Sequence, residues 1–328
     1  PTCERILGEL VLPLLWAGDP QLQLQIGQDM RRLLMQEVLD HLQTIGRPAR
    51  NIIFVEPRSD GSGTDEQDAL AAYFHDRFGM KVLHTDPQQL RLDKGEVYCG
   101  DMVVDLAYRD YSVSELLKLA AAGADVAPMR ALFEQNRIIS SITAELDQKS
   151  CWEVLTDPAV THRYFSADER QVFRRHILWT RIVADRRSLL PDGQTGDLLE
   201  YARREHEYLV LKPNRSFGGH GVLIGHAMTR PEWDAAIERA LRDAKDGERW
   251  VVQQLAGIPV YEFPVVGPEG NLHVEPFHTV MGFAPTKDGL SILGRASQKQ
   301  VVNVAQRGGM CAVVIGHPVG GFHGPGRG

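Results

Sequence analysis

Hydrophobic positions along the first 125 residues change repeatedly between helical and strand spacing. Apolar residues recur every three or four positions over 30–45, a helical pattern that Gly46 ends. Three strand-like apolar runs follow, at 51–55, 81–84 and 102–108. Two further helices are expected, each opened by a capping-box pair, Thr64 with Gln67 and Ser112 with Glu115. This alternation predicts a small parallel sheet covered by helices.

The pattern changes in the second half of the chain. Two helices are expected at 128–145 and 166–181, and strands dominate after Gly196. The expected strands lie at 208–211, 222–225, 250–254, 260–266, 272–280, 291–295 and 300–304, with a helix over 229–244. We therefore expect an α+β unit rich in antiparallel strands. The predicted domains are 1–125, 126–316 and a Gly/Pro-rich tail, 317–328, that we expect to be disordered.

Composition excludes several classes of protein. The 328 residues suffice for about two domains, and a net charge of −7 gives no general attraction to nucleic acid or anionic lipid. No apolar run approaches the roughly 18 residues needed to cross a bilayer, and no signal-peptide pattern is present. The four cysteines are far apart, and the histidines show no zinc-ligand spacing. We expect a cytoplasmic protein without membrane or nucleic-acid partners. A homodimer is the expected oligomeric state, because it is the commonest one among soluble oligomers.

The segment 208–225 carries the strongest chemical signal. A strand ends at Lys212, and a turn containing Gly218, Gly219 and Gly221 leads into a second strand. Glycines let backbone N–H groups approach phosphate oxygens, and a lysine adds a compact cation. The segment matches neither a Walker loop nor a dinucleotide fingerprint. The alternative interpretation is a glycine-rich hairpin with a surface lysine.

Three separated segments together resemble a known family. They are 147–155, which contains Lys149, the glycine-rich segment 208–225, and 302–309. In this order they are similar to the ATP-grasp ligases, and most of all to circularly permuted carboxylate–amine ligases related to glutathionylspermidine synthase. The resemblance implies an α+β ATP-grasp fold of two lobes, preceded by a small α/β pre-ATP-grasp domain. It also implies ATP and Mg2+ as cofactors.

The resemblance assigns nucleotide-binding roles to three parts of the chain. Lys149 and Lys212 would contact the phosphates and the adenine region, and Lys212 would also have a catalytic role. The loop residues expected to contact ATP are Ser216, Gly218, Gly219, His220 and Gly221. The segment 250–257 matches the hinge that binds adenine and ribose, which selects Gln253, Gln254 and Leu255. Lys149 could instead be a solvated helix start, and 250–257 a plain amphipathic strand.

The metal and phosphoryl-transfer roles are also implied by the resemblance. Asn303 and Glu275 would be magnesium ligands, because Mg2+ takes oxygen ligands and few of them from protein. The family commonly has an acid two residues before that Asn, where this chain has Val301; Glu262 or Asp288 could substitute. Arg295 would neutralise charge on the transferred phosphoryl group, unless it is a surface arginine on a strand.

Candidate substrate contacts lie in the first domain. Tyr108 and Arg109 end a strand, where ligands of open α/β sheets gather, although a structural ion pair there is an equal alternative. Arg58 lies in a glycine-containing turn between a strand and a helix, a geometry that can bind an anion.

The sequence thus predicts an ATP-dependent ligase. A substrate carboxylate would be phosphorylated by MgATP, and an amine would attack the acyl phosphate to give an amide. A kinase on the same scaffold is one alternative. A noncatalytic nucleotide-binding or scaffold protein is the other, because Val301 and Gln254 stand where the family often has acids.

Overall fold

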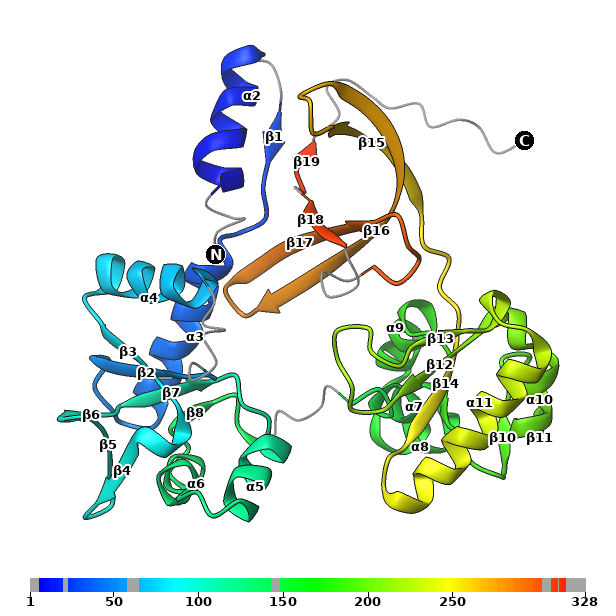
Figure 1. The fold of residues 1–328 in the computed structure, drawn as a ribbon, viewed down its shortest axis with the longest axis horizontal. Helices are drawn as coiled ribbons and strands as arrows, with labels where there is room; N and C mark the ends of the chain where they lie inside the picture. The colour runs from blue at the N-terminus through cyan, green and yellow to red at the C-terminus, as the bar shows by residue number, and fades with distance from the viewer. Residues whose placement is uncertain are drawn as a thin grey trace. The chain divides into compact units, whose positions relative to one another are not determined.

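A computed structural model describes residues 6–19, 23–57, 65–142, 148–302, 308–311 and 313–316. The structure is mixed α+β and separates into two compact units (Figure 1). Unit 1 contains Pro1–Glu145, Met281–Gly294 and Met310–Gly328, and unit 2 contains Leu146–Val280 and Arg295–Gly309. The chain therefore leaves unit 1 twice and returns to it twice. The domain division expected after residue 125 falls at a different place in the chain from this one.

A parallel sheet forms the centre of unit 1, as the alternating pattern predicts. Its order is β3 (Lys81–Thr85), β2 (Asn51–Val55), β7 (Leu106–Arg109) and β8 (Ile138–Ile139). All three neighbouring pairs are parallel. The first strand of this sheet in the chain, β2, is an inner strand, because β3 and β7 pair on its two sides.

Alternate residues of β2 enter two different cores. Ile52 and Phe54 pack with residues of α3 (Met30–Thr44) and α4 (Asp65–Phe78). Ile53 and Val55 pack with residues of α5 (Val113–Ala121) and α6 (Ala127–Glu134). Successive side chains of a strand point to opposite faces, so helices on both faces explain why this strand is apolar throughout.

Two expectations for unit 1 are wrong in detail. The helix expected over 128–145 ends at Glu134, Asn136 has a left-handed φ of 54°, and Ile138 then lies buried in β8. The strand expected over 102–108 is divided in two. Its first part, β6 (Met102–Val103), joins β4 (Leu90–Asp93) and β5 (Glu96–Cys99) in an antiparallel meander.

The structure also contains short helices and a pair of short strands in unit 1, and one further sheet. Unit 1 also holds η1 (Ile6–Val11), α2 (Leu12–Gly18) and η2 (Pro87–Gln89), and β1 (Leu24–Gln25) pairs antiparallel with β19 (Ile315–Gly316). A further sheet has the order β15 (Val260–Val266), β16 (Leu272–Thr286), β17 (Gly289–Ser297) and β18 (Gly309–Cys311).

Unit 2 is built on an antiparallel sheet. Its order is β13 (Leu223–Ile224), β12 (Leu209–Pro213), β14 (Trp250–Gln254) and β9 (Thr180–Ile182). Leu211 and Val252 face a core that contains the fully buried Trp233 of α11 (Arg230–Asp243) and residues of α10 (Leu198–Arg204). The remaining elements are α7 (Cys151–Thr156), α8 (Pro158–Tyr164), α9 (Ala167–His176), β10 (Arg187–Leu189), β11 (Thr195–Asp197), η4 (His206–Tyr208), η5 (Gly225–Ala227) and η6 (Ala244–Asp246).

Two expectations for unit 2 are also wrong. The helix expected over 166–181 ends at His176, and the chain continues as β9, whose Arg181 is fully buried. Residues 300–302 are not in a strand, and the rest of that expected strand, 303–304, lies outside the described residues. Capping boxes form at Ser166–Glu169 and at Thr229–Glu232, where α9 and α11 begin.

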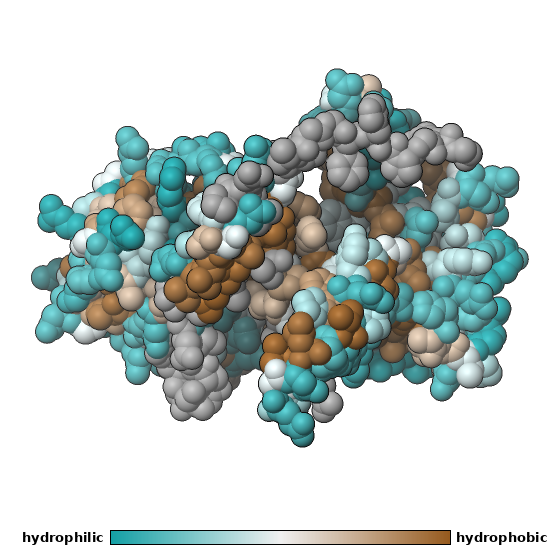
Figure 2. Space-filling model, turned by 90° about the horizontal axis from the view of Figure 1, so that it is seen from above, coloured by the Kyte–Doolittle hydropathy of each residue, from teal (hydrophilic) through white to brown (hydrophobic). Residues whose placement is uncertain are grey.

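The surface mixes polar residues with exposed apolar ones. The face drawn in Figure 2 shows hydrophobic patches among hydrophilic side chains. Large exposed hydrophobic residues include Leu14, Phe217 and Val266. No helix among the described residues is both long enough and apolar enough to cross a membrane.

Candidate functional site

Two lysines far apart in the sequence meet at one end of β12 in unit 2. The amine of Lys149, which precedes α7, donates hydrogen bonds to the carbonyl oxygens of Ser216 at 2.5 Å and of Asn214 at 3.3 Å. Lys212 lies on β12 itself, and its amine donates to Oε1 of Gln253 at 2.7 Å. The fold therefore brings together Lys149, Lys212 and the loop that begins at Ser216, to which the resemblance assigns a shared role.

Lys212 and Gln253 lie on the sheet face opposite the core. Lys212 is opposite Val251, and Gln253 is opposite Val210, so all four share one face, whereas Leu211 and Val252 face the core. Nε2 of Gln253 donates to Oγ1 of Thr180 at 2.8 Å. The amide of Gln253 therefore connects Lys212 with β9 and holds the lysine against the sheet.

The surroundings of Lys212 change the pKa of its amine. Burial, and second the nearby charge of Lys149, hold the pKa of the Lys212 amine below its usual value. Both causes disfavour the ammonium form of Lys212. An anion placed between the two amines would offset the repulsion from Lys149. A lysine with a perturbed pKa beside a like charge is a common feature of functional sites.

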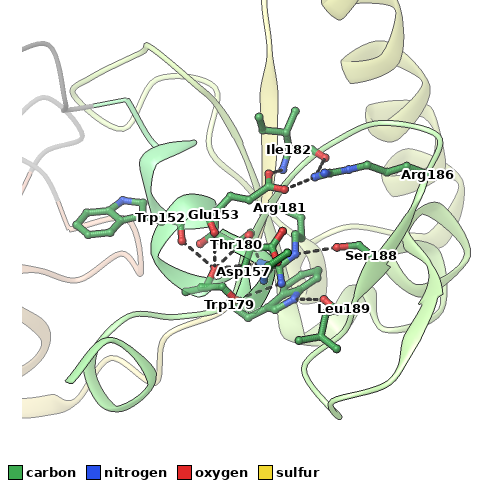
Figure 3. A network of polar contacts seen from close by, with 12 residues as sticks. Trp152, Glu153, Asp157, Trp179, Thr180, Arg181, Ile182, Arg186, Ser188 and Leu189 are labelled. Atoms are coloured by element: carbon green, nitrogen blue, oxygen red, sulfur yellow. Dashed lines mark hydrogen bonds and ion pairs between the residues drawn. The ribbon is translucent and has the colours of Figure 1, made fainter. Parts of the chain in front are cut away.

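A buried polar network fixes the helix that follows Lys149 (Figure 3). The carboxylate of Glu153, on α7, accepts hydrogen bonds from the backbone N–H of Ile182 and from the guanidinium of Arg186, both at 2.6 Å. The guanidinium of Arg181 donates to Oγ1 of Thr156 at 3.0 Å and to Oγ of Ser188 at 2.8 Å. These contacts anchor α7 to β9 and so restrict the position of Lys149.

Asn214 is a second anchor, and our sequence interpretation gave it no role. Its buried side chain accepts a hydrogen bond at its Oδ1 from the backbone N–H of Ser150, at 2.8 Å. Its carbonyl oxygen accepts from the backbone N–H of Lys149, at 3.2 Å. The sequence feature that could have indicated this role is the position of Asn214, two residues after Lys212 and directly after the strand.

The loop after β12 has the backbone that its glycines predict. Gly218, Gly219 and Gly221 have φ of 65°, 76° and 68°, a region that other residues rarely adopt. A Cβ on Gly221 would also lie 2.7 Å from Cγ of Pro213. His220 is exposed in this loop, and Ser216 is half-buried.

The expected adenine hinge is an ordered continuation of the sheet. The backbone N–H of Gln254 donates to the carbonyl of Trp179 at 2.9 Å, and that of Leu255 to the carbonyl of Tyr208 at 2.8 Å. The side-chain oxygen and nitrogen of Gln253 both form hydrogen bonds with residues of the sheet. The side chain of Gln254 is exposed. Of the glutamines, Gln254 has the side chain more accessible to a ligand.

Of the two expected metal ligands, Glu275 is hydrogen-bonded within the chain and Asn303 lies outside the described residues. The carboxylate of Glu275, on β16, accepts hydrogen bonds from Nε2 of His273 at 2.7 Å and from the amide of Gln298. Arg295 is half-buried on β17, and Asn303 lies outside the described residues. Among the residues that the structure does describe, no three or more His, Cys, Asp or Glu are grouped as a metal site.

The expected substrate contacts of unit 1 are engaged within the chain. The guanidinium of Arg109 donates to the carbonyl of Ser140 at 2.7 Å and to that of Tyr111 at 2.6 Å. Burial, with a smaller contribution from the charge of Asp110, raises the pKa of Tyr108. Tyr108 lines a pocket of about 130 Å³, smaller than usual small-molecule sites. Arg58 lies outside the described residues.

Comparisons with known proteins give a distant structural similarity. No protein-family model and no curated protein matches this sequence. Among solved structures, a glutathione synthetase-like effector from Globodera pallida, solved in its apo form, is similar with a TM-score of 0.46 and 10% identity. The match covers 81% of this chain and 58% of that protein. The family membership implied by Lys149, Lys212 and the glycine loop therefore stays a prediction.

Proposed function

We propose that unit 2 binds MgATP through Lys149 and Lys212 and that the chain is an ATP-dependent carboxylate–amine ligase. The observation that carries this proposal is the convergence of the two amines beside the glycine loop. A polyphosphate fits this arrangement because its negative charge would neutralise the two neighbouring ammonium groups. The left-handed glycines allow backbone N–H groups of the loop to approach the same phosphates.

Magnesium fits the residues less completely. Glu275 offers a carboxylate, and Mg2+ usually takes only one or two protein ligands besides phosphate and water oxygens. Glu275 and Asn303 would hold the ion. When bound, the ion would supply Lewis-acid neutralisation of the triphosphate oxygens.

In the proposed reaction, a substrate carboxylate oxygen attacks the γ-phosphorus of ATP, ADP leaves, and an acyl phosphate forms. The amine then attacks the acyl carbon, the C–O bond to phosphate breaks, and an amide and phosphate result. Lys149 and Lys212 would orient the phosphates, and Arg295 would offset negative charge during transfer. The loop with His220 would exclude water from the acyl phosphate.

A second candidate is a chain that binds nucleotide without turnover. It is favoured by the uncharged Val301, two positions before Asn303, and by Gln254, since the family often has acids at both positions. Phosphoryl transfer without ligation, as in a kinase, is the remaining alternative. Release of ADP separates catalysis from binding alone, and a requirement for the amine separates ligation from kinase activity.

The direct test is calorimetric titration of MgATP into the wild type and Lys212→Met. Hydrogen bonds between charged groups and their partners contribute about 1.5–3 kcal/mol, so we expect the variant to bind roughly ten- to a hundredfold more weakly. Lys245→Met, which replaces an exposed lysine of η6 in the same unit, is the matched control. Equal affinities of the two variants would remove Lys212 from the site, and no binding by the wild type would refute the proposal.

A further inference from the structure

A pocket of about 450 Å³ lies within unit 1, whereas the lysine site belongs to unit 2. Its volume is within the usual range for small-molecule sites. Three parts of the chain form its walls: the N-terminal segment with η1, the helices α3 and α4, and β17 with Val313. The backbone N–H of Gln28 donates to the carbonyl of Leu290 at 3.0 Å, which joins the first wall to the third.

Three arginines and two acids, Asp29 and Glu9, line this pocket, so its positive charge exceeds its negative charge by one. Arg31 is bound by Asp29 through contacts of 2.6–3.1 Å, and its guanidinium lies 4.4 Å from the ring centroid of Tyr73. Arg32 and Arg77 also line the pocket, and neither has a hydrogen-bonded or ion-paired side chain in the part of the chain that the structure describes. Two guanidinium groups are therefore available for a ligand.

The rest of the pocket lining is largely apolar. Leu7, Ile26, Phe78, Ile292 and Val313 contribute hydrocarbon surface, and Tyr73 adds an aromatic ring. Burial, and second the charge of Asp29, raise the pKa of Tyr73, so its hydroxyl stays protonated and can donate a hydrogen bond.

We propose that this pocket binds a small organic anion, a carboxylate or phosphate monoester carried on an apolar or aromatic body. Arg32 and Arg77 would bind the anionic head, since the paired N–H donors of a guanidinium group match two oxygens of a carboxylate or of a phosphate. The apolar side chains would cover the body of the ligand. This site does not depend on nucleotide binding by unit 2.

The test uses the fluorescent probe 8-anilinonaphthalene-1-sulfonate, which joins one anionic head to an aromatic body. We expect one probe per chain and a loss of affinity of about tenfold in the double variant Arg32→Met/Arg77→Met, because exposed charge pairs are individually weak. Arg50→Met/Arg130→Met replaces two exposed arginines of unit 1 that do not line the pocket, and should bind like the wild type. The neutral analogue N-phenyl-1-naphthylamine should bind all three proteins equally.

Competition identifies the anionic head. Displacement of the probe by 3-phenylpropionate indicates a carboxylate ligand, and displacement by phenyl phosphate a phosphate monoester. Equal probe affinity in the two double variants would overturn the proposal, as would equal displacement by the neutral 3-phenylpropanol. Circular dichroism of each variant establishes that the loss of binding is not a loss of folding.

Discussion

Arg181 offers the sharpest test of how unit 2 is held together. Its side chain is fully buried, and its guanidinium donates to Oγ of Ser188, Oγ1 of Thr156 and the carbonyl of Thr180, at 2.8, 3.0 and 2.7 Å. Arg181→Met keeps most of the aliphatic length but removes every one of these donors. The variant therefore removes the Arg181 contact between β9 and α7, retains the one between Ile182 and Glu153, and leaves no large cavity.

The expected loss of stability follows from two opposing effects. A buried polar group that loses its partner costs about 1–3 kcal/mol, and Ser188 and Thr180 are both buried. Burial lowers the pKa of the Arg181 guanidinium, so the variant also regains part of the cost of desolvating a charge. We expect a net decrease of about 2–3 kcal/mol in the free energy of unfolding.

Urea unfolding followed by tryptophan fluorescence measures this decrease. Four of the five tryptophans, Trp152, Trp179, Trp233 and Trp250, belong to unit 2, so the signal reports mainly on that unit. Arg187→Met is the control, because this exposed side chain donates, within the described parts of the chain, only to the carbonyl of Thr195. It should change stability by less than about 0.5 kcal/mol. A similar small change in Arg181→Met would refute the network as the anchor of α7.

Two further predictions concern the glycine loop and the lysine site. Gly221→Ala should destabilise unit 2 by at least about 1 kcal/mol more than Gly247→Ala, because both have positive φ but only the first Cβ would contact Pro213; equal losses in urea unfolding would contradict this. ATP binding should raise the lowered pKa of Lys212, so binding should take up protons at pH values between the pKa of the free site and that of the complex. Calorimetry in two buffers of different ionisation enthalpy measures this uptake, which Lys212→Met should lack; an uptake unchanged in the variant would assign it to another group.

Much of the fold could be predicted because local signals agree with the tertiary structure. The strands at 51–55, 250–254 and 260–266 have the predicted bounds. The capping box at Ser112–Glu115 also forms as its spacing predicts. Several short strands were missed, and two of them, β8 and β9, each follow a helix whose apolar pattern continues into the strand. Pairing with a neighbouring strand, which is not local, decides both.

The candidate site shows the same limit. The residue types of Lys149 and Lys212 are informative, since only eight of the 36 basic residues are lysines. Their convergence depends on Asn214, which contacts Ser150 from 64 positions away. No pattern within either segment specifies that contact. The surplus arginines Arg32 and Arg77 lie on separate helices and become one feature only when α3 and α4 pack together.

The central claim is that Lys149 and Lys212 bind the phosphates of ATP, and lysine footprinting tests it residue by residue. The protein is acetylated with and without saturating MgATP, and mass spectrometry follows each of the lysines. The account predicts that MgATP protects Lys149 and Lys212 and leaves the exposed Lys81 and Lys245 unchanged. Unchanged acetylation of Lys149 and Lys212 in the presence of MgATP would contradict it.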